Sequence, residues 1–156
     1  MLTHVDQNNR PTMVTISDKA ITQRSATARS QIYLPDVIFN LLKNGEIESK
    51  KGPVFNTAII AGTMAAKKTH ELIPFCHPIP LEGCKFNIFS DQKNHVVIEC
   101  TVQCQNKTGV EMEALTGANI AALTIYDMCK ALSQDMIITA TEVVEKKGGK
   151  SEIKKK

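Results

Sequence analysis

Apolar and polar residues alternate along two neighbouring segments in the middle of the sequence. In 84–90 and in 96–104, most apolar residues stand two positions apart, with polar or charged residues between them. Alternation of this kind predicts strands that bury one face. The polar residues Asp91–Asn94 separate the two segments and predict the turn of a hairpin.

Two other segments carry apolar residues at helical spacing. The longer predicted helix covers 110–132 and is apolar over most of its circumference. A second helix is predicted to begin at Asn56 or Thr57, because both residue types can cap a helix N-terminus. Its apolar positions continue to about 71–73, where the helix is predicted to end.

The remaining segments complete an alternation of strands and helices. Strands are predicted at 26–34 and 136–144. A short helix is predicted to begin at Pro35, a residue that suits the first helical turn, and to stop at Gly45. Three prolines make 73–81 a stiff extended loop. This order predicts an α+β sandwich in which helices pack on one face of an antiparallel sheet.

The length of 156 residues fits one domain. We expect a flexible N-terminal arm at 1–12, a single catalytic domain at 13–151 and a basic tail at 152–156. Hydrophobic residues make up 42% and charged residues 22%, which excludes a disordered chain. A net charge of +3 and an aromatic content of 4% argue against nucleic-acid binding. Because large aromatic residues are few, we expect the chain to complete its core by oligomerising.

The sequence also predicts a cellular location. No stretch approaches the roughly 20 apolar residues of a membrane-spanning helix, and the polar N-terminus carries no secretory signal. Five cysteines at irregular spacing form a poor disulfide framework and suit a reducing compartment. We therefore expect a soluble cytoplasmic protein without membrane association.

One polar line runs along the otherwise apolar segment 110–132. At about 100° per residue, five residues fall within about 40° of that line, and Lys130 lies about 60° from Asp127. The two residues could form an exposed ion pair worth roughly a few tenths of a kcal/mol. In a buried or cleft position their pKa values would shift, as proton transfer requires. We favour the second alternative because the rest of the helix is apolar. The line consists of Glu113, Gly117, Ile120, Thr124 and Asp127.

Three further features have functional and ordinary interpretations. Cys76-His77 stands in the proline-rich loop, which would hold His77 at a fixed orientation for binding; a metal site there would need more converging ligands than the spacing supplies. The segment Gly148–Ser151 is not a phosphate loop of the GxxxxGK[ST] type, because position 144 is Val144. Several lysines are each most simply solvated charges, but together they would bind a polyanion such as a nucleotide phosphate. They are Lys51, Lys67, Lys68, Lys130, Lys146 and Lys150.

Two long strings of sequence resemble the MoaC family closely. They are TAIIAGTMAAKKTHELIPFCH at 57–77 and KTGVEMEALTGANIAALTIYDMCKAL at 107–132. The ending Gly148–Ser151 resembles the family as well. The likeness covers about 13–151 in order. The chain departs from the usual family pattern at Pro53 and Glu152, among other places.

The resemblance implies a fold, an assembly and an activity. It implies a ferredoxin-like α+β sandwich that forms a homohexamer, a trimer of dimers, with active sites at dimer interfaces. It implies a lyase of molybdenum cofactor biosynthesis that converts 3′,8-cyclo-7,8-dihydro-GTP, the product of a radical SAM partner enzyme, into cyclic pyranopterin monophosphate and pyrophosphate. No tightly bound cofactor is expected, and magnesium could accompany the substrate phosphates.

The resemblance also assigns roles to individual residues. The family's catalytic aspartate and its neighbouring lysine match Asp127 and Lys130, and Lys51 and Lys67 match further catalytic lysines. We hypothesise that Lys67 or Lys130 protonates the purine-derived ring while Asp127 sets the pKa of its partner. The substrate-binding residues match Phe75, Cys76, His77, Met112, Glu113, Lys146 and Arg24.

Two alternatives belong to other functional classes. A non-catalytic nucleotide-binding regulator would keep the lysines but would show no turnover. A metal-binding oligomeric scaffold would use Cys76, His77 and Cys84 as ligands. Elemental analysis of the purified protein would distinguish the scaffold from the enzyme, and a turnover assay would distinguish the regulator.

Overall fold

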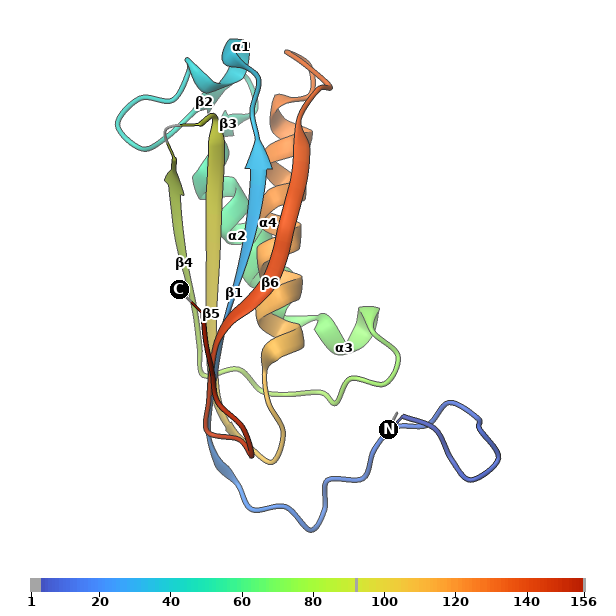
Figure 1. The fold of residues 1–156 in the computed structure, drawn as a ribbon. Coiled ribbons are helices and arrows are strands. Elements are labelled where there is room, and N and C mark those ends of the chain that lie inside the picture. Colours follow the sequence, from blue (N-terminus) through green and yellow to red (C-terminus); the bar gives the residue numbers. More distant parts are fainter. Residues whose placement is uncertain (1–3, 92, 156) are drawn as a thin grey trace.

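The computed structural model describes residues 4–91 and 93–155, and shows one five-stranded sheet with helices packed on it (Figure 1). The sheet contains β1 (Thr22–Tyr33), β4 (Gly83–Ser90), β5 (His95–Asn106), β6 (Ile137–Lys147) and β7 (Ile153–Lys154). The two-residue strands β2 (Glu48–Ser49) and β3 (Gly52–Pro53) form a separate hairpin, and the helices are α1 (Asp36–Phe39), α2 (Val54–Lys67), α3 (Thr69–Leu72) and α4 (Glu111–Cys129).

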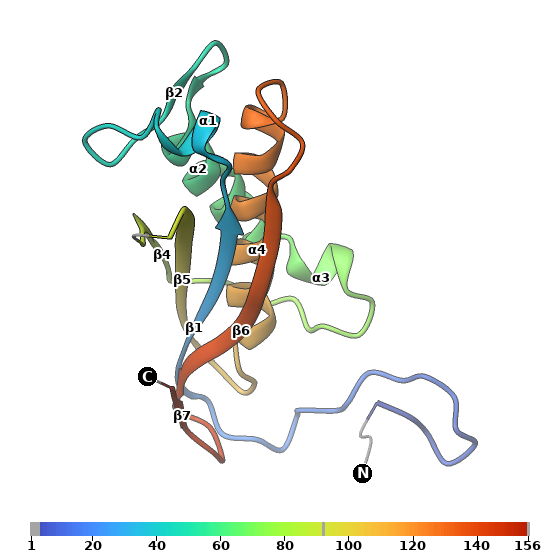
Figure 2. The same ribbon diagram turned by 45° about the horizontal axis from the view of Figure 1, so that its top comes forward.

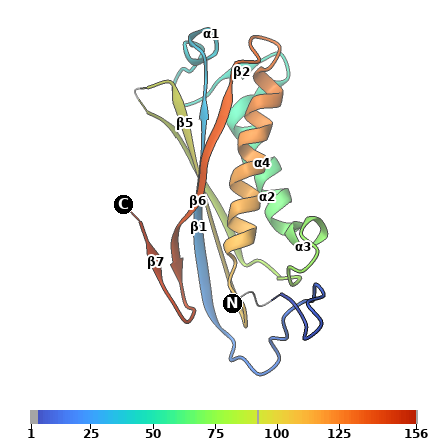
Figure 3. The ribbon, with the colours of Figure 1, turned by 45° about the vertical axis from the view of Figure 1, so that its right-hand side comes forward.

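The strand order confirms the predicted fold class. The order across the sheet is β4-β5-β1-β6-β7, and every neighbouring pair is antiparallel. The connection through α2 joins β1 to β4 with β5 between them, and α4 joins β5 to β6 with β1 between them. These are two split βαβ units, the arrangement of a ferredoxin-like sandwich. Both long helices lie on the same face of the sheet (Figure 3).

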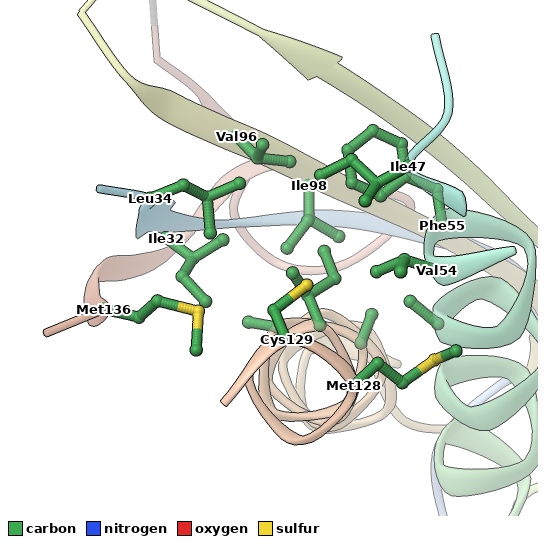
Figure 4. Packing of buried hydrophobic residues seen from close by; sticks show 14 of the residues in the cluster. Ile32, Leu34, Ile47, Val54, Phe55, Val96, Ile98, Met128, Cys129 and Met136 are labelled. Carbon is green, nitrogen blue, oxygen red and sulfur yellow. The ribbon is translucent and has the colours of Figure 1, made fainter. Parts of the chain in front are cut away.

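Side chains from the sheet and both long helices form the core. Ile32 and Ile98 from the central strands meet Val54 of α2 and Cys129 of α4 in one buried cluster (Figure 4). The alternating burial along β1 and β5 follows from the two-residue period of a strand, which turns every second side chain toward the helices. The cluster fixes the C-terminal end of α4 against the start of α2.

A pair of glycines allows α2 and α4 to approach closely. A Cβ on Gly62 would lie 2.8 Å from the carbonyl oxygen of Gly117 and 2.5 Å from Cζ of Phe86. A larger side chain at Gly62 would therefore push the helices apart, and a Cβ on Gly117 would lie 2.7 Å from Sγ of Cys100 on β5. The two helices run antiparallel, so the start of α2 lies beside the end of α4 (Figure 3; Figure 2 gives a second view).

The start of α2 differs from the prediction. The predicted caps at Asn56 and Thr57 are wrong, because the helix already begins at Val54. The carboxylate of Glu46 accepts hydrogen bonds from the backbone N–H groups of Phe55 and Asn56. A distant side chain thus replaces the local cap, which no local sequence pattern reveals.

The other helix boundaries also differ from the prediction. The predicted continuation of α2 to 71–73 breaks at Lys68, after which the hydroxyl of Thr69 donates to the carbonyl oxygen of Ala66 (3.0 Å) and α3 begins. The short helix α1 already ends at Phe39. The long helix α4 ends at Cys129 instead of residue 132.

Both predicted chain ends contain bridged residues, and the tail joins the sheet. In the predicted tail, Lys154 pairs with Glu145, so β7 adds a short edge strand to the sheet. In the predicted arm, Val5 and Pro11 form an isolated bridge. Residues 1–3 of the arm, residue 92 of the predicted hairpin turn and residue 156 of the tail lie outside the described residues. The division into arm, domain and tail stays a prediction.

Two findings bear on the expected environment of the chain. All five cysteines are free thiols in the structure. Within 4–91 and 93–155, none of the helices has both the length and the apolar character needed to cross a bilayer.

Candidate active site

The last turn of α4 carries a small cluster of opposite charges. One carboxylate oxygen of Asp127 lies 2.7 Å from Nζ of Lys130, which follows three residues later on the same face of the helix. The other carboxylate oxygen lies 3.0 Å from Nζ of Lys51, at the tip of the β2–β3 hairpin. Lys51 also donates to the backbone carbonyl of Asp127 (3.3 Å). Three of the four predicted catalytic residues therefore meet at one point.

The predicted burial of this cluster is wrong for the single chain. The side chains of Asp127, Lys130 and Lys51 are all more than half exposed, whereas Glu113 at the other end of the polar line is buried. The sheet and α2 cover the sides of α4 that carry Ala122 and the other small apolar residues. The line from Glu113 to Asp127 thus runs from the interior to the surface.

The ion pairs shift the pKa values within the cluster. The hydrogen bonds from Lys130 and Lys51 hold the pKa of Asp127 below its usual range. The same interaction with Asp127 raises the pKa of Lys130. Asp127 therefore stays ionised and Lys130 stays protonated at neutral pH, so the cluster presents fixed opposite charges and a proton donor at the surface.

A second group of predicted residues lines a cleft of about 280 Å³ at the N-terminal end of α4. The proline-rich loop contributes one wall and the first turn of α4 contributes another. Every predicted substrate-binding residue from these two segments is found here, together with His4 from the N-terminal segment. The predicted residues are Phe75, Cys76, His77, Met112 and Glu113.

Glu113 is the buried carboxyl group of this cleft. Only 4% of the residue is exposed, and burial raises its pKa to about 7, with a further contribution from the charge of Glu111. A carboxyl group that titrates near neutral pH can give or accept a proton under working conditions. Glu113 is thus suited to acid–base chemistry as well as to substrate contact.

The raised pKa of Glu113 predicts a pH-dependent stability. In the unfolded chain a glutamate titrates near pH 4.3, so between about pH 4.5 and 7 the unfolded state loses this proton while the folded state keeps it. The free energy of unfolding should therefore fall by roughly 3 kcal/mol as the pH rises through this window. In Glu113→Gln this contribution should vanish. Urea unfolding at constant protein concentration measures the difference. A parallel pH dependence in wild type and Glu113→Gln would contradict the prediction, and exposed Glu71→Gln serves as the control.

A third group of residues forms a basic cleft of about 550 Å³ beside the second one. Its predicted members are Arg24 near the start of β1 and Lys146 near the end of β6; Lys146 pairs with Glu111 at 2.6 Å. Arg24 donates to the carbonyl oxygens of Asn106 and Lys107 (3.4 and 3.5 Å). The antiparallel register brings these distant segments together. The cleft gathers five cationic side chains: Lys19, Arg24, Lys107, Lys146 and Lys150.

Sequence reasoning missed three residues that line these clefts. Lys107 is the first residue of the string KTGVEMEAL and stands just before the cleft residues of α4. Its position in the sequence could therefore have identified it as a site residue. Lys19 and His4 stand in polar segments without any pattern that marks them. The predicted lysine Lys68 does not line the basic cleft.

Lys67 occupies a separate cleft. It lines a space of about 470 Å³ together with Thr63 of the same helix and Cys84 of β4. Ile79 lines both this cleft and the one around Glu113. Cys84 is therefore apart from Cys76 and His77. Within the described ranges no three His, Cys, Asp or Glu side chains gather to hold a metal ion, so nothing there supports the scaffold alternative.

The ion cluster and the three clefts thus place the predicted site residues at the two opposite ends of α4. Glu113 and Asp127 are 14 residues apart in one helix, which corresponds to about 21 Å along its axis. Lys67, Arg24 and Lys146 belong to the end with Glu113, and Lys51 and Lys130 belong to the end with Asp127. A single small substrate cannot contact both groups within one chain.

Comparisons with known proteins agree on one family. The model of the MoaC family matches residues 13–149. A cyclic pyranopterin monophosphate synthase of Xanthomonas axonopodis pv. citri (strain 306) is 56% identical over 152 residues, which cover 97% of this chain and 92% of that protein. The synthase of the same name from Campylobacter jejuni (strain RM1221) is 50% identical over 151 residues (96% and 95%). A molybdenum cofactor biosynthesis bifunctional protein of Synechocystis sp. (strain ATCC 27184 / PCC 6803 / Kazusa) is 52% identical over 157 residues (98% and 45%).

Proposed function

Because this chain belongs to the MoaC family, we propose that it is a cyclic pyranopterin monophosphate synthase. In this reaction 3′,8-cyclo-7,8-dihydro-GTP is rearranged to cyclic pyranopterin monophosphate, and pyrophosphate leaves. The observation that carries the proposal is the convergence of the family-matched residues into an Asp127 ion cluster and a set of adjoining clefts.

The basic cleft is suited to the polyphosphate of this substrate. A triphosphate needs several cations from different directions, and pyrophosphate departure leaves negative charge that fixed cations stabilise. Arg24 and Lys146 supply two such charges, and Lys107 and Lys150 supply two more from neighbouring segments. These residues would hold the phosphates and stabilise the leaving group.

The two ends of α4 supply groups for the ring rearrangement. Opening and rebuilding the guanine-derived ring requires protons to be given and taken at defined atoms. The protonated Lys130, held by Asp127, is one donor, and Lys67 in its separate cleft is the other candidate. Glu113 can exchange a proton near neutral pH, and His77 lines the same cleft.

The proposed assembly is a homohexamer, a trimer of dimers, with active sites shared between protomers. The separation of the two residue groups supports a shared site, since a partner chain could bring an Asp127 cluster to the clefts around Glu113. Exposed apolar side chains supply surface for such contacts. They include Ile60 and Met64 on α2, Leu123 on α4, and Leu132 and Ile137 after it.

The remaining parts of the proposal concern cofactors, partners and location. The described residues supply no ligand set of their own for a metal, so magnesium, where it takes part, would arrive on the substrate phosphates. A radical SAM enzyme would supply the substrate, and the protein would act in the cytoplasm on this small molecule, without a membrane or nucleic-acid partner.

An anaerobic assay tests the function directly. The protein is incubated with 3′,8-cyclo-7,8-dihydro-GTP, and the product is oxidised to its fluorescent pterin and quantified, with heat-denatured protein as the control. Product formation that depends on intact protein is the expected result. Tight binding of the substrate without product would overturn the proposal in favour of the nucleotide-binding regulator.

A further inference from the structure

The carboxylate of Glu46 accepts four hydrogen bonds. One of its oxygens accepts the backbone N–H groups of Ile47 (2.8 Å) and Phe55 (2.7 Å). The other accepts the backbone N–H (3.1 Å) and the side-chain amide (3.0 Å) of Asn56. A single side chain thus joins the segment just before β2 to the first turn of α2.

A tight turn fixes the position of Glu46 itself. Lys43 and Glu46 exchange two backbone hydrogen bonds of 2.9 and 3.1 Å across the residues Asn44 and Gly45. These two residues have φ values of 52° and 78°, the backbone conformation of a two-residue hairpin turn of type I′. Asn-Gly is the sequence preferred for this turn, so Glu46 is held by a rigid local structure.

The hydrogen bonds of Glu46 close the base of the hairpin that carries Lys51. The chain leaves the carboxylate at Ile47, forms β2 and β3, and returns at Val54, whose N–H donates to the carbonyl oxygen of Ile47 (2.9 Å). At the tip, Ser49 donates through its hydroxyl to the carbonyl of Gly52 (2.9 Å) and accepts from the N–H of Lys51 (3.1 Å). The route from Glu46 to Lys51 is therefore hydrogen-bonded at both ends of the hairpin.

The same carboxylate satisfies a helix end that lacks its own cap. Pro53 precedes α2 and makes no side-chain cap hydrogen bond. The N–H groups of Phe55 and Asn56 belong to the first turn, where a negative charge also interacts favourably with the helix dipole. Phe55 is buried, so loss of the carboxylate would leave its N–H without a partner in the core.

We propose that Glu46 is a positioning residue that fixes the hairpin so that Lys51 reaches Asp127. The inference rests on the proposed function for its catalytic meaning, but its structural content concerns the Lys51–Asp127 contact alone. Glu46 does not touch the Asp127 cluster. It acts through the hairpin, because the ammonium group of Lys51 can meet the carboxylate of Asp127 only when the hairpin tip is held beside α4.

Amine labelling tests the contact without reference to catalysis. The folded protein is acetylated for short times, and mass spectrometry gives the labelling rate of Lys51 relative to Lys50, its exposed neighbour at the same tip. In wild type the ion pair should protect Lys51. In Glu46→Ala the ratio should rise several-fold, toward the value in Asp127→Asn, and in Glu46→Gln it should rise less because one acceptor oxygen remains. Glu48→Ala, an exposed glutamate two residues away, should leave the ratio unchanged.

Turnover provides the second readout. In the anaerobic assay kcat/KM of Glu46→Ala should fall by on the order of 10- to 100-fold, since small displacements of a catalytic group cost about this much. Partial recovery in Glu46→Gln would support the proposal. If Glu46→Ala does not fold, the labelling ratio and turnover of Glu46→Gln decide the question.

The outcomes separate this inference from the proposed function. An unchanged labelling ratio in a folded Glu46 variant would overturn the positioning role, even where turnover falls, because the loss would then arise elsewhere. A raised ratio would support the positioning role even if the wild-type protein forms no product, and in that case only the proposed function would fail.

Discussion

Replacing Asp127 with asparagine should reduce kcat of the proposed synthase by roughly 10³-fold while the fold stays intact. The amide keeps the shape of the side chain but carries no charge. Its single acceptor oxygen can no longer hold both ammonium groups, of Lys130 and Lys51, which lie 2.7 and 3.0 Å from the carboxylate oxygens of Asp127. The negative charge of the cluster and the fixed position of the proton donor Lys130 are lost together.

The exposure of the cluster makes this variant a clean test. An exposed ion pair contributes little to the free energy of unfolding, so the circular dichroism and urea midpoint of Asp127→Asn should match wild type. Asp135→Asn, another exposed aspartate just beyond the same end of α4, is the control and should keep full activity. Full turnover by a folded Asp127→Asn would remove Asp127 from the mechanism. We expect Lys51→Ala, Lys67→Ala and Lys130→Ala also to fold and to lose turnover.

Much of the fold could be predicted because its elements have strong local patterns. The two-residue alternation of β4 and β5 and the long apolar helix α4 depend on the residues within each element. The boundaries could not be predicted where a distant residue determines them. Glu46 caps α2 from nine and ten residues away, and β7 exists because Lys154 meets Glu145 across the sheet edge.

The candidate site could likewise be predicted only where local spacing determines it. The pairing of Asp127 with Lys130 could be predicted from their spacing, because residues three positions apart in a helix lie on the same face. Exposure could not be predicted from the helix alone, because it depends on which sides the sheet and α2 cover. The basic cleft depends on strand register: Arg24 and Lys146 are far apart in the sequence and meet because β1 and β6 are neighbours.

Mixed assemblies of two inactive variants should regain activity. Asp127→Asn damages the end of α4 that carries the ion cluster, and Lys67→Ala damages a cleft beside the opposite end, where Glu113 lies about 21 Å from Asp127 along the helix axis. If each active site combines one end from each of two chains, a dimer with one copy of each variant has one doubly damaged site and one intact site. With random pairing half of the dimers are mixed, so about a quarter of wild-type activity should return.

The experiment compares two co-expressed pairs. The first pair is Asp127→Asn with Lys67→Ala, each carried on a differently tagged chain, and kcat is measured in the anaerobic assay against each variant alone. The second pair is Asp127→Asn with Lys130→Ala. These two residues form an ion pair on one chain, so every site of a mixed dimer lacks one of them and no activity should return.

The contrast between the two pairs carries the conclusion. Recovery in the first pair alone would mean that the two ends of α4 come from different chains, and it would explain why one chain leaves its proposed catalytic aspartate more than half exposed. Recovery in neither pair, with both variants folded and co-purifying, would mean that the active site is not shared between two chains. The residues around Glu113 and the Asp127 cluster would then have to meet by a rearrangement within one chain, against the rigid spacing of the helix that joins them.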